Sequence, residues 1–162
     1  MDLTDINNLK SFLSRFRIRP SAKLGQNFLI SQPVLEKILE AAELDPADTV
    51  VEIGSGIGTL TLRLALSAGR VFAVEKDARL IPPLRSLLKK NSNVQIINQD
   101  FLKVNVPQLL TADYSLPAGF KVVANIPYYI TGKILGALLA LPQKPKTIVL
   151  LVQKEVGERI CS

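Results

Sequence analysis

The segment 125–129 brings an amide side chain, a proline and two aromatic rings together directly after an apolar run. The side-chain oxygen of Asn125 and the main-chain carbonyl of Ile126 can accept both hydrogens of an exocyclic amine such as that of adenine. This would localise the nitrogen lone pair for an in-line methyl transfer. Pro127 would hold the turn rigid, and Tyr128 would stack on the extruded base. The competing interpretation is an ordinary strand-ending turn with a buried tyrosine.

A second stretch able to do chemistry follows the extended run 49–53, with glycines at every other position from 54 to 58. Glycines allow positive φ and let a ligand approach the main chain, so Gly54 and Gly56 are candidate cofactor contacts. A dinucleotide fingerprint would have its third glycine at Thr59. Glu52 would repel a pyrophosphate but tolerate a cationic ligand. The pattern therefore favours S-adenosylmethionine over NAD, and a tight turn with no ligand is the alternative.

Two acidic residues follow the next two apolar runs along the chain. Glu75 comes about twenty positions after the first glycine, where related folds bind ribose hydroxyls through two carboxylate oxygens. A solvated carboxylate beside Lys76 is the competing interpretation. Asp100 follows the third apolar run, at the edge where ligands gather in such sheets. With Gly54 and Asn125, these residues mark the ends of four successive predicted strands.

The pattern of apolar residues predicts the elements that position these groups. Extended runs predict five strands, over 49–53, 71–75, 94–98, 121–124 and 146–152. Helical spacing predicts helices over 5–16, 32–43, 60–68, up to about 90, 131–141 and from 155 onward. Residues 103–119 have no sustained period and predict a connection with at most one helical turn. Strands that alternate with helices predict an α/β fold: a mainly parallel sheet between two helical layers, wound right-handed.

Composition limits the possible chemistry. The 162 residues can bury one sizeable core, and 20 Lys and Arg against 14 Asp and Glu leave a net charge of +6. An anionic partner such as nucleic acid fits this balance, as does a merely soluble basic protein. With no histidine and one cysteine, the chain cannot form an internal disulfide, a Ser-His-Asp triad or most zinc sites. We therefore expect no metal centre.

The beginning of the chain, residues 1–5, is acidic and polar, unlike a signal peptide, and no apolar run approaches the length of a membrane span. We expect a cytoplasmic protein without a membrane partner. Five lysines and no acidic residue occur between 114 and 154, around Asn125. These lysines, which predict contacts with RNA phosphates or only solvate helix ends and loops, are Lys121, Lys133, Lys144, Lys146 and Lys154.

Four motifs in order resemble the ribosomal RNA adenine dimethyltransferase family, and most closely its bacterial small-subunit branch. They are KLGQNFL at 23–29, EIGSGIG at 52–58, NIPYY at 125–129 and QKEVGERI at 153–160. The resemblance extends from residue 19 to residue 160. It implies a Rossmann-like class I methyltransferase that uses S-adenosylmethionine to dimethylate two adjacent adenosines near the 3′ end of small-subunit ribosomal RNA. The implied partner is the small ribosomal subunit or its precursor.

The resemblance also implies roles for individual residues. Asn27 and Leu29 would close over the cofactor, and Gly54 would approach its methionine part. Glu75 would hold the ribose and Asp100 would accept from the adenine amino group. Asn125 is implied in both cofactor binding and catalysis, with Tyr128 as the second catalytic residue.

Two departures from the family pattern stand out. The pair Pro82-Pro83 occurs where the family has a regular helix, and the chain stops where the family continues. We expect an N-terminal helix and cofactor-closing segment over 1–30 and an incomplete cofactor-binding domain over 31–162. The family's C-terminal helical domain would be absent, and the fold would be truncated after the fifth strand, leaving an apolar edge.

Three alternatives stay open at this point. Methyltransferases that modify large-subunit ribosomal RNA share the glycine turn and the NIPY motif, although segment 153–160 resembles the small-subunit branch more. Some relatives bind nucleic acid without catalysis as their main role, which the intact Asn125 and Tyr128 argue against. A small NAD-dependent dehydrogenase ranks last because of the glycine spacing.

Overall fold

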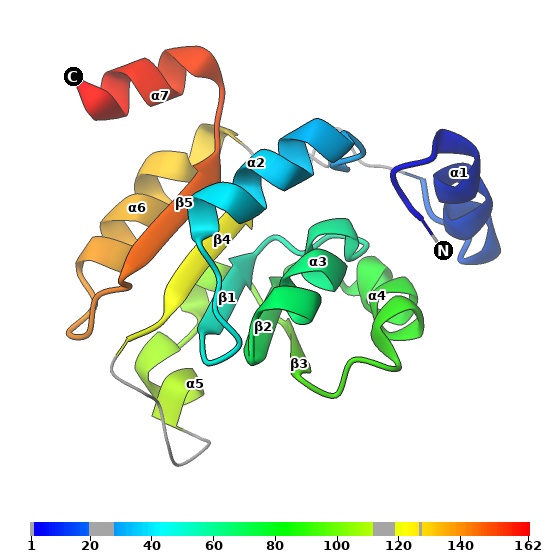
Figure 1. Cartoon of the computed structure of the whole chain (residues 1–162), viewed down its shortest axis with the longest axis horizontal. Coiled ribbons are helices and arrows are strands. Elements are labelled where there is room, and N and C mark those ends of the chain that lie inside the picture. The colour runs from blue at the N-terminus through cyan, green and yellow to red at the C-terminus, as the bar shows by residue number, and fades with distance from the viewer. Residues whose placement is uncertain (1, 20–27, 112–118, 127) are drawn as a thin grey trace.

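The computed structural model describes residues 2–19, 28–111, 119–126 and 128–162, with only the backbone at 110, 111, 128 and 161. Its centre is a five-stranded, fully parallel sheet in the order β3-β2-β1-β4-β5 (Figure 1). The strands are β1 (Thr49–Ile53), β2 (Arg70–Glu75), β3 (Val94–Asn98), β4 (Lys121–Asn125) and β5 (Thr147–Leu151). All five predicted strands are therefore confirmed, each to within about two residues at either end.

The three central strands are the most deeply buried part of the molecule. Every residue of β1 is buried, as are all but the first of β2 and the middle three of β4. A parallel strand covered on both faces must be apolar on both, which explains why these runs are continuous rather than alternating. The outer strands β3 and β5 are only half-buried.

The helices are short, and their bounds follow the predicted ones closely. They are α1 (Ile6–Arg15), α2 (Gln32–Ala42), α3 (Thr59–Ser67), α4 (Ile81–Leu88), α5 (Val106–Thr111), α6 (Thr131–Leu139) and α7 (Lys154–Cys161). The described residues also form 3₁₀ turns at η2 (Ala78–Leu80), η3 (Phe101–Lys103) and η4 (Tyr128–Ile130). None of the helices in the described part of the chain is long and apolar enough to cross a membrane.

Helices cover both faces of the sheet. On one face, α2 and α3 bury Leu35, Ile38 and Leu64 against the central strands. On the other face, α6 with η3 and α5 buries Phe101 and Ile134, among others. The three-layer architecture expected from the alternating pattern is thus confirmed, and the strand ends 53, 75, 98 and 125 all point to the same edge of the sheet.

The N-terminal helix α1 packs beside the glycine turn. Its buried face contributes Leu9 and Phe12 to a cluster with Ile57 and Leu80. Asp5 is the N-cap, since its side chain accepts hydrogen bonds from two main-chain N–H groups of the first turn, at 2.8 and 2.9 Å. In Figure 1, α1 lies at the side of the molecule opposite α6 and α7.

The starts of α2 and α4 and the connection after residue 103 show local details that the sequence pattern did not specify. Ser31 occupies the N-cap position of α2, but its side chain makes no capping hydrogen bond. Pro82 and Pro83 lie inside the first turn of α4, where their missing N–H groups need no partner, and η2 precedes them. The connection after residue 103 contains α5, which is more regular than predicted.

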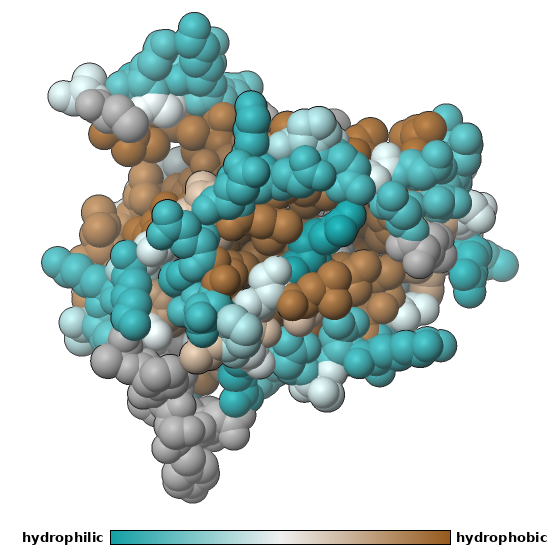
Figure 2. Space-filling view, viewed as in Figure 1, coloured by the Kyte–Doolittle hydropathy of each residue, from teal (hydrophilic) through white to brown (hydrophobic). Residues whose placement is uncertain are grey.

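Strand β5 forms the outer edge of the described sheet, paired only with β4 among the strands described. Its side chains Ile148 and Leu150 are half-buried, and Leu139 of α6 and Ile160 of α7 are more than half exposed. Figure 2 shows apolar side chains gathered below α7 on this side of the molecule. The expected apolar edge at the fifth strand is therefore present.

Gly69 has a packing role that the sequence did not indicate. It follows the helix predicted over 60–68, and α3 ends at Ser67 with Ala68 as its C-cap. A Cβ atom at Gly69 would lie 2.2 Å from the carbonyl oxygen of Pro46. The close approach of two backbones, not a left-handed turn, requires a glycine here.

We predict that Gly69→Ala lowers the free energy of unfolding by roughly 1–3 kcal/mol, because backbone must move to admit the methyl group. Gly136→Ala is the matched control: it lies inside α6 with no neighbouring atom within 4 Å of its added Cβ. Alanine there should stabilise the protein by about 1 kcal/mol through helix propensity. Urea denaturation of both variants measures this, and equal effects would contradict the packing role of Gly69.

Candidate active site

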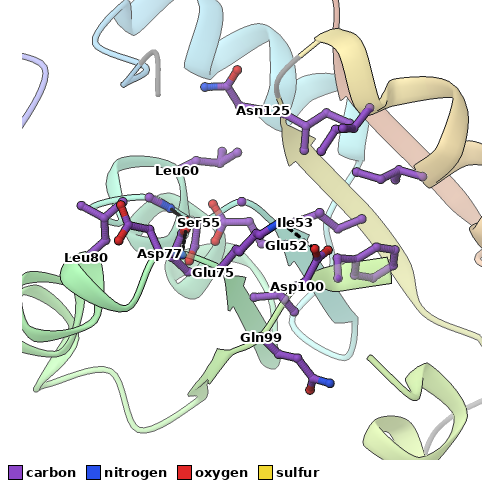
Figure 3. A pocket seen from close by; sticks show the side chains of 18 of the residues that line it. Glu52, Ile53, Ser55, Leu60, Glu75, Asp77, Leu80, Gln99, Asp100 and Asn125 are labelled. Atoms are coloured by element: carbon purple, nitrogen blue, oxygen red, sulfur yellow. Dashed lines mark hydrogen bonds and ion pairs between the residues drawn. The ribbon is translucent and has the colours of Figure 1, made fainter. Parts of the chain in front are cut away.

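A pocket of about 350 Å³ opens at the carboxyl edge of the sheet, above the ends of β1, β2 and β4. Figure 3 looks into it, with Asn125 on one side and Gln99 on the other. The lining residues that the sequence analysis singled out are Leu29, Glu52, Gly54, Gly56, Glu75, Asp100, Asn125 and Ile126. Side chains from four strand ends thus meet in one cavity, as parallel pairing requires.

The glycine turn runs beneath this pocket with left-handed φ at positions 54, 56 and 58. The N–H groups of Gly54 and Ser55 both donate to the carbonyl of Val74, at 2.8 and 3.1 Å, which ties the turn to β2. Gly58, at φ 95°, is the N-cap of α3, and a Cβ there would lie 2.6 Å from Leu84. The turn therefore needs glycine for its conformation and for its contact with α4.

Glu75 joins the turn to the end of β2. One carboxylate oxygen accepts from the N–H of Gly56 at 2.7 Å, and the other accepts from the N–H of Asp77 at 2.7 Å. The residue is 8% exposed, and burial raises the pKa of its carboxyl group, while the two backbone hydrogen bonds oppose that rise. The solvated carboxylate that we considered as the alternative for Glu75 is excluded by this burial.

Glu52 is the most deeply buried acidic residue of the pocket, at 1% exposed. Its Oε2 atom has no hydrogen-bond partner among the described residues, and the hydroxyls of Ser55 and Thr59 nearby in the turn also lack one. Burial raises the pKa of Glu52 to about 8, and the neighbouring Glu75 carboxylate adds to the rise. A buried carboxyl group that has one unpaired oxygen beside a cavity suits a cationic, hydrogen-bonding ligand.

Asp100 lies at the end of β3 and is engaged on both oxygens. Its Oδ2 atom accepts from Nζ of Lys76 at 2.8 Å, and its Oδ1 atom accepts from the N–H of Leu102 at 3.2 Å, capping η3. The ammonium group of Lys76 lowers the pKa of Asp100. Asp100 is therefore an ionised acceptor at the edge of the pocket.

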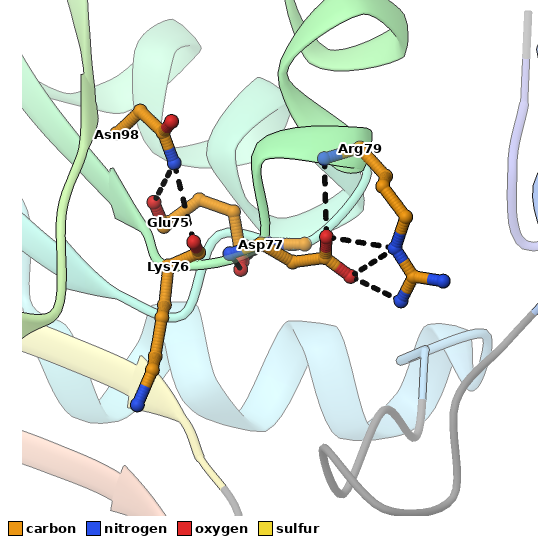
Figure 4. Close-up of polar contacts among 6 residues, drawn as sticks. Glu75, Lys76, Asp77, Arg79 and Asn98 are labelled. Carbon is orange, nitrogen blue, oxygen red and sulfur yellow. Dashed lines mark hydrogen bonds and ion pairs between the residues drawn. The ribbon is translucent and has the colours of Figure 1, made fainter.

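A network of polar contacts holds the residues after β2 in place (Figure 4). The Asn98 side chain donates to the carbonyls of Glu75 and Lys76, at 2.9 and 3.3 Å. Asp77 forms an ion pair with Arg79 at 2.6 Å, on the side away from Lys76. The sequence analysis missed Asp77 and Asn98, although the Glu-x-Asp spacing, which places alternate residues on one side of an extended chain, could have indicated the first.

The predicted catalytic segment follows β4 directly. Asn125 is the last residue of that strand and lines the pocket, and Ile126 after it is 3% exposed. Tyr129 is 71% exposed and also lines the pocket. The side chain of Tyr128 and the whole of Asn27 lie outside the described part of the structure, so their predicted roles stay predictions.

The five lysines around Asn125 do not share one surface. Lys133, at the beginning of α6, lines the pocket and is exposed. Lys121 is only 13% exposed and pairs with Asp48 at 2.9 Å, so its interpretation as a phosphate contact is wrong. Lys144 and Lys146 precede β5 and therefore lie toward the amino edge of the sheet, away from the pocket. Sequence proximity to Asn125 did not imply spatial proximity.

The chain matches a known protein family over most of its length. Residues 17–162 match the family described as ribosomal RNA adenine dimethylase. The chain belongs to this family. The dimethylase relatives include the ribosomal RNA small subunit methyltransferase A of Clostridium botulinum strain Okra, 42% identical over 153 residues, or 94% of this chain and 54% of the relative. The chain thus spans about half the length of the curated relatives it matches.

Solved structures of dimethylase relatives share the fold. The 23S rRNA methyltransferase ErmE matches with a TM-score of 0.69 and 34% identity over 82% of this chain and 50% of its own. A dimethyladenosine transferase from Plasmodium falciparum matches with a TM-score of 0.69 and 30% identity over 84% of this chain and 46% of its own. The Rossmann-like methyltransferase fold expected from the sequence is confirmed.

We predict that Glu52→Gln stabilises the ligand-free protein increasingly as the pH rises from about 4.5 to about 8. Because the native state holds the Glu52 proton more tightly than the unfolded chain does, wild-type stability falls over this range, by at most about 1.4 kcal/mol per pH unit. Glutamine cannot ionise, so the variant lacks this loss.

Thermal unfolding of wild type and variant across this pH range measures the difference. Glu36→Gln removes the same charge from the exposed surface of α2 and serves as the control. A Glu52→Gln effect that is the same at low and high pH would contradict the protonated, buried state of Glu52.

Proposed function

We propose that this chain carries the S-adenosylmethionine site of an enzyme that dimethylates N6 of two adjacent adenosines near the 3′ end of small-subunit ribosomal RNA. The observation that supports this most is the pocket in which Glu52, Glu75, Asp100 and Asn125 meet. An anionic pocket with a buried, unpaired carboxyl oxygen suits a cationic nucleoside and opposes a pyrophosphate. Membership of the dimethylase family supports the same conclusion.

The proposed cofactor contacts follow the order of the strands. Glu75 would accept from the ribose hydroxyls with the lone pairs that its two backbone hydrogen bonds leave available. Asp100 would accept from the adenine amino group, and Gly54 would approach the methionine part. Glu52 lies beneath that end of the pocket, where its carboxylate would face the cofactor's positive charge.

The proposed reaction is a direct displacement at the methyl carbon. The N6 lone pair of adenine forms the new bond to that carbon, and the carbon–sulfur bond breaks with its electron pair going to sulfur, which leaves a neutral thioether. The side-chain oxygen of Asn125 and the carbonyl of Ile126 accept the amine hydrogens and hold the nitrogen in line. One proton leaves nitrogen for water after each transfer, so no histidine is needed.

We also propose roles for the N-terminal segment and for Tyr128, and a partner for the enzyme. Residues 1–30 would supply a helix and a segment that closes over the cofactor through Asn27 and Leu29, and residues 31–162 the cofactor-binding domain. Leu29 already lines the pocket and packs against the cluster under α2. The enzyme would bind its target RNA within the small ribosomal subunit or its precursor, in the cytoplasm. Tyr128 would stack on the target base.

Calorimetric titration with S-adenosylhomocysteine and with NAD, together with methylation of small subunits that lack these methyl groups, tests the function. Preference for NAD would contradict it. Methylation of large-subunit RNA in place of small-subunit RNA would instead favour the activity that the name of the ErmE relative describes.

We predict opposite patterns for two variants in these assays. Glu75→Ala should weaken S-adenosylhomocysteine binding by roughly 1–3 kcal/mol, because ribose hydroxyls lose their acceptor. Asn125→Ala should abolish methyl transfer while affecting cofactor affinity less than rate, because its main contact is the target amine. Equal losses of affinity and rate for Asn125→Ala would identify it as a cofactor-binding residue only.

The positions of the lysines generate a matched pair of variants. We predict that Lys133→Gln lowers the salt dependence of RNA binding by roughly one phosphate contact, because Lys133 lies at the pocket. Lys144→Gln removes the same charge at the opposite edge of the sheet and should leave the slope unchanged. Binding titrations over a range of salt concentrations measure both slopes, and identical slopes for the two variants would contradict a contact at Lys133.

A further inference from the structure

Lys76 forms an ion pair with Asp100, the carboxylate that would accept from the cofactor's adenine. It follows β2, its side chain is 68% exposed, and its Nζ atom lies 2.8 Å from Oδ2 of Asp100, a residue that lines the pocket. The other oxygen of Asp100 accepts from Leu102. Each oxygen of Asp100 therefore already has one donor before any ligand binds. An adenine amino group that approaches Oδ2 meets the ammonium group of Lys76 beside that oxygen.

The same lysine also lies at the mouth of the pocket. Lys76, Tyr129 and Lys133 all line the cavity. Lys133 and Tyr129 are both exposed. A target base that reaches Asn125 must bring its phosphates near this group. A cation released from Asp100 would therefore be near an RNA backbone without further movement of the main chain.

We propose that Lys76 couples the two ligands of this site. While the pocket is empty, Lys76 pairs with Asp100; when the cofactor's adenine amino group takes that carboxylate, Lys76 turns to an RNA phosphate beside Lys133. This inference rests on the proposed function. Lys76 is thus a positioning residue that makes cofactor and RNA bind cooperatively, although it takes no part in the methyl transfer.

The size of the effect follows from the exposure of the ion pair. Exposed ion pairs contribute little to stability. The need to break the Lys76–Asp100 pair should therefore weaken cofactor binding by about two- to fivefold relative to a variant without this ion pair. Linkage requires the reciprocal effect: cofactor binding must strengthen RNA binding by the same factor by which RNA strengthens cofactor binding. Raised salt should shrink the factor, because both partners of Lys76 are exposed to screening.

Lys76→Met tests the proposal, since it keeps the aliphatic stem and removes the charge. S-adenosylhomocysteine affinity is measured by calorimetry, and affinity for a short single-stranded RNA with two adjacent adenosines by fluorescence anisotropy, with and without saturating S-adenosylhomocysteine. Lys144→Met is the control for net charge. The Asp100→Asn chain, with and without Lys76→Met, completes a double-mutant cycle.

We expect Lys76→Met to bind S-adenosylhomocysteine about two- to fivefold more tightly than wild type. Its RNA affinity should no longer depend on S-adenosylhomocysteine, while wild type and Lys144→Met keep that dependence. In the Asp100→Asn background, Lys76→Met should leave S-adenosylhomocysteine affinity unchanged. Unchanged or weaker S-adenosylhomocysteine binding by Lys76→Met overturns the coupling alone, whereas failure of the wild type to bind S-adenosylhomocysteine overturns the proposed function itself.

Discussion

The carboxylate of Glu75 joins the two segments on which the pocket depends. Its oxygens accept from the main chain of Gly56 in the glycine turn and of Asp77 after β2, at 2.7 Å each. Hydrogen bonds to an ionised acceptor are about twice as strong as neutral ones. The turn and the end of β2 are far apart in sequence, so these bonds, with those of Gly54 and Ser55 to Val74, set the position of one segment against the other. The turn also contacts α1 and α4.

This arrangement places two buried carboxyl groups near each other. Glu75 has two hydrogen-bond donors, whereas Oε2 of Glu52 has none within the described structure, and the pKa of Glu52 rises to about 8. The protein is therefore least stable when the pocket is empty and Glu52 is ionised. A cationic ligand that donates hydrogen bonds would relieve this, so the same groups that reduce the stability of the free protein would strengthen binding.

The parallel sheet also divides the charges of the chain between two edges. Asp100, Asn125 and Lys133 come together at the carboxyl edge, where the pocket lies. At the amino edge, Lys121 donates to the main-chain carbonyls of Ala42 and Glu43 at the end of α2 and pairs with Asp48. Burial raises the pKa of Asp48, but the hydrogen bond from Lys121 opposes this, and the pKa lies below its usual value. A lysine four residues before Asn125 thus stabilises the packing of α2 on the sheet, and contacts with an anionic partner must come from other residues.

Much of this protein follows from local sequence. Continuous apolar runs identified β1, β2 and β4, because these central strands are buried on both faces. Parallel strand ends meet at one edge, so Glu75, Asp100 and Asn125 could be placed together in advance. Three features depended on tertiary structure. Lys76 reaches Asp100 across 24 positions in the chain, Gly69 meets the backbone of Pro46, and Oε2 of Glu52 is left without a donor in the described structure. Each feature depends on a contact, or on a missing contact, between segments distant in sequence. The periodicity of a sequence indicates which face of an element a residue occupies, but it does not indicate which residues lie opposite that face.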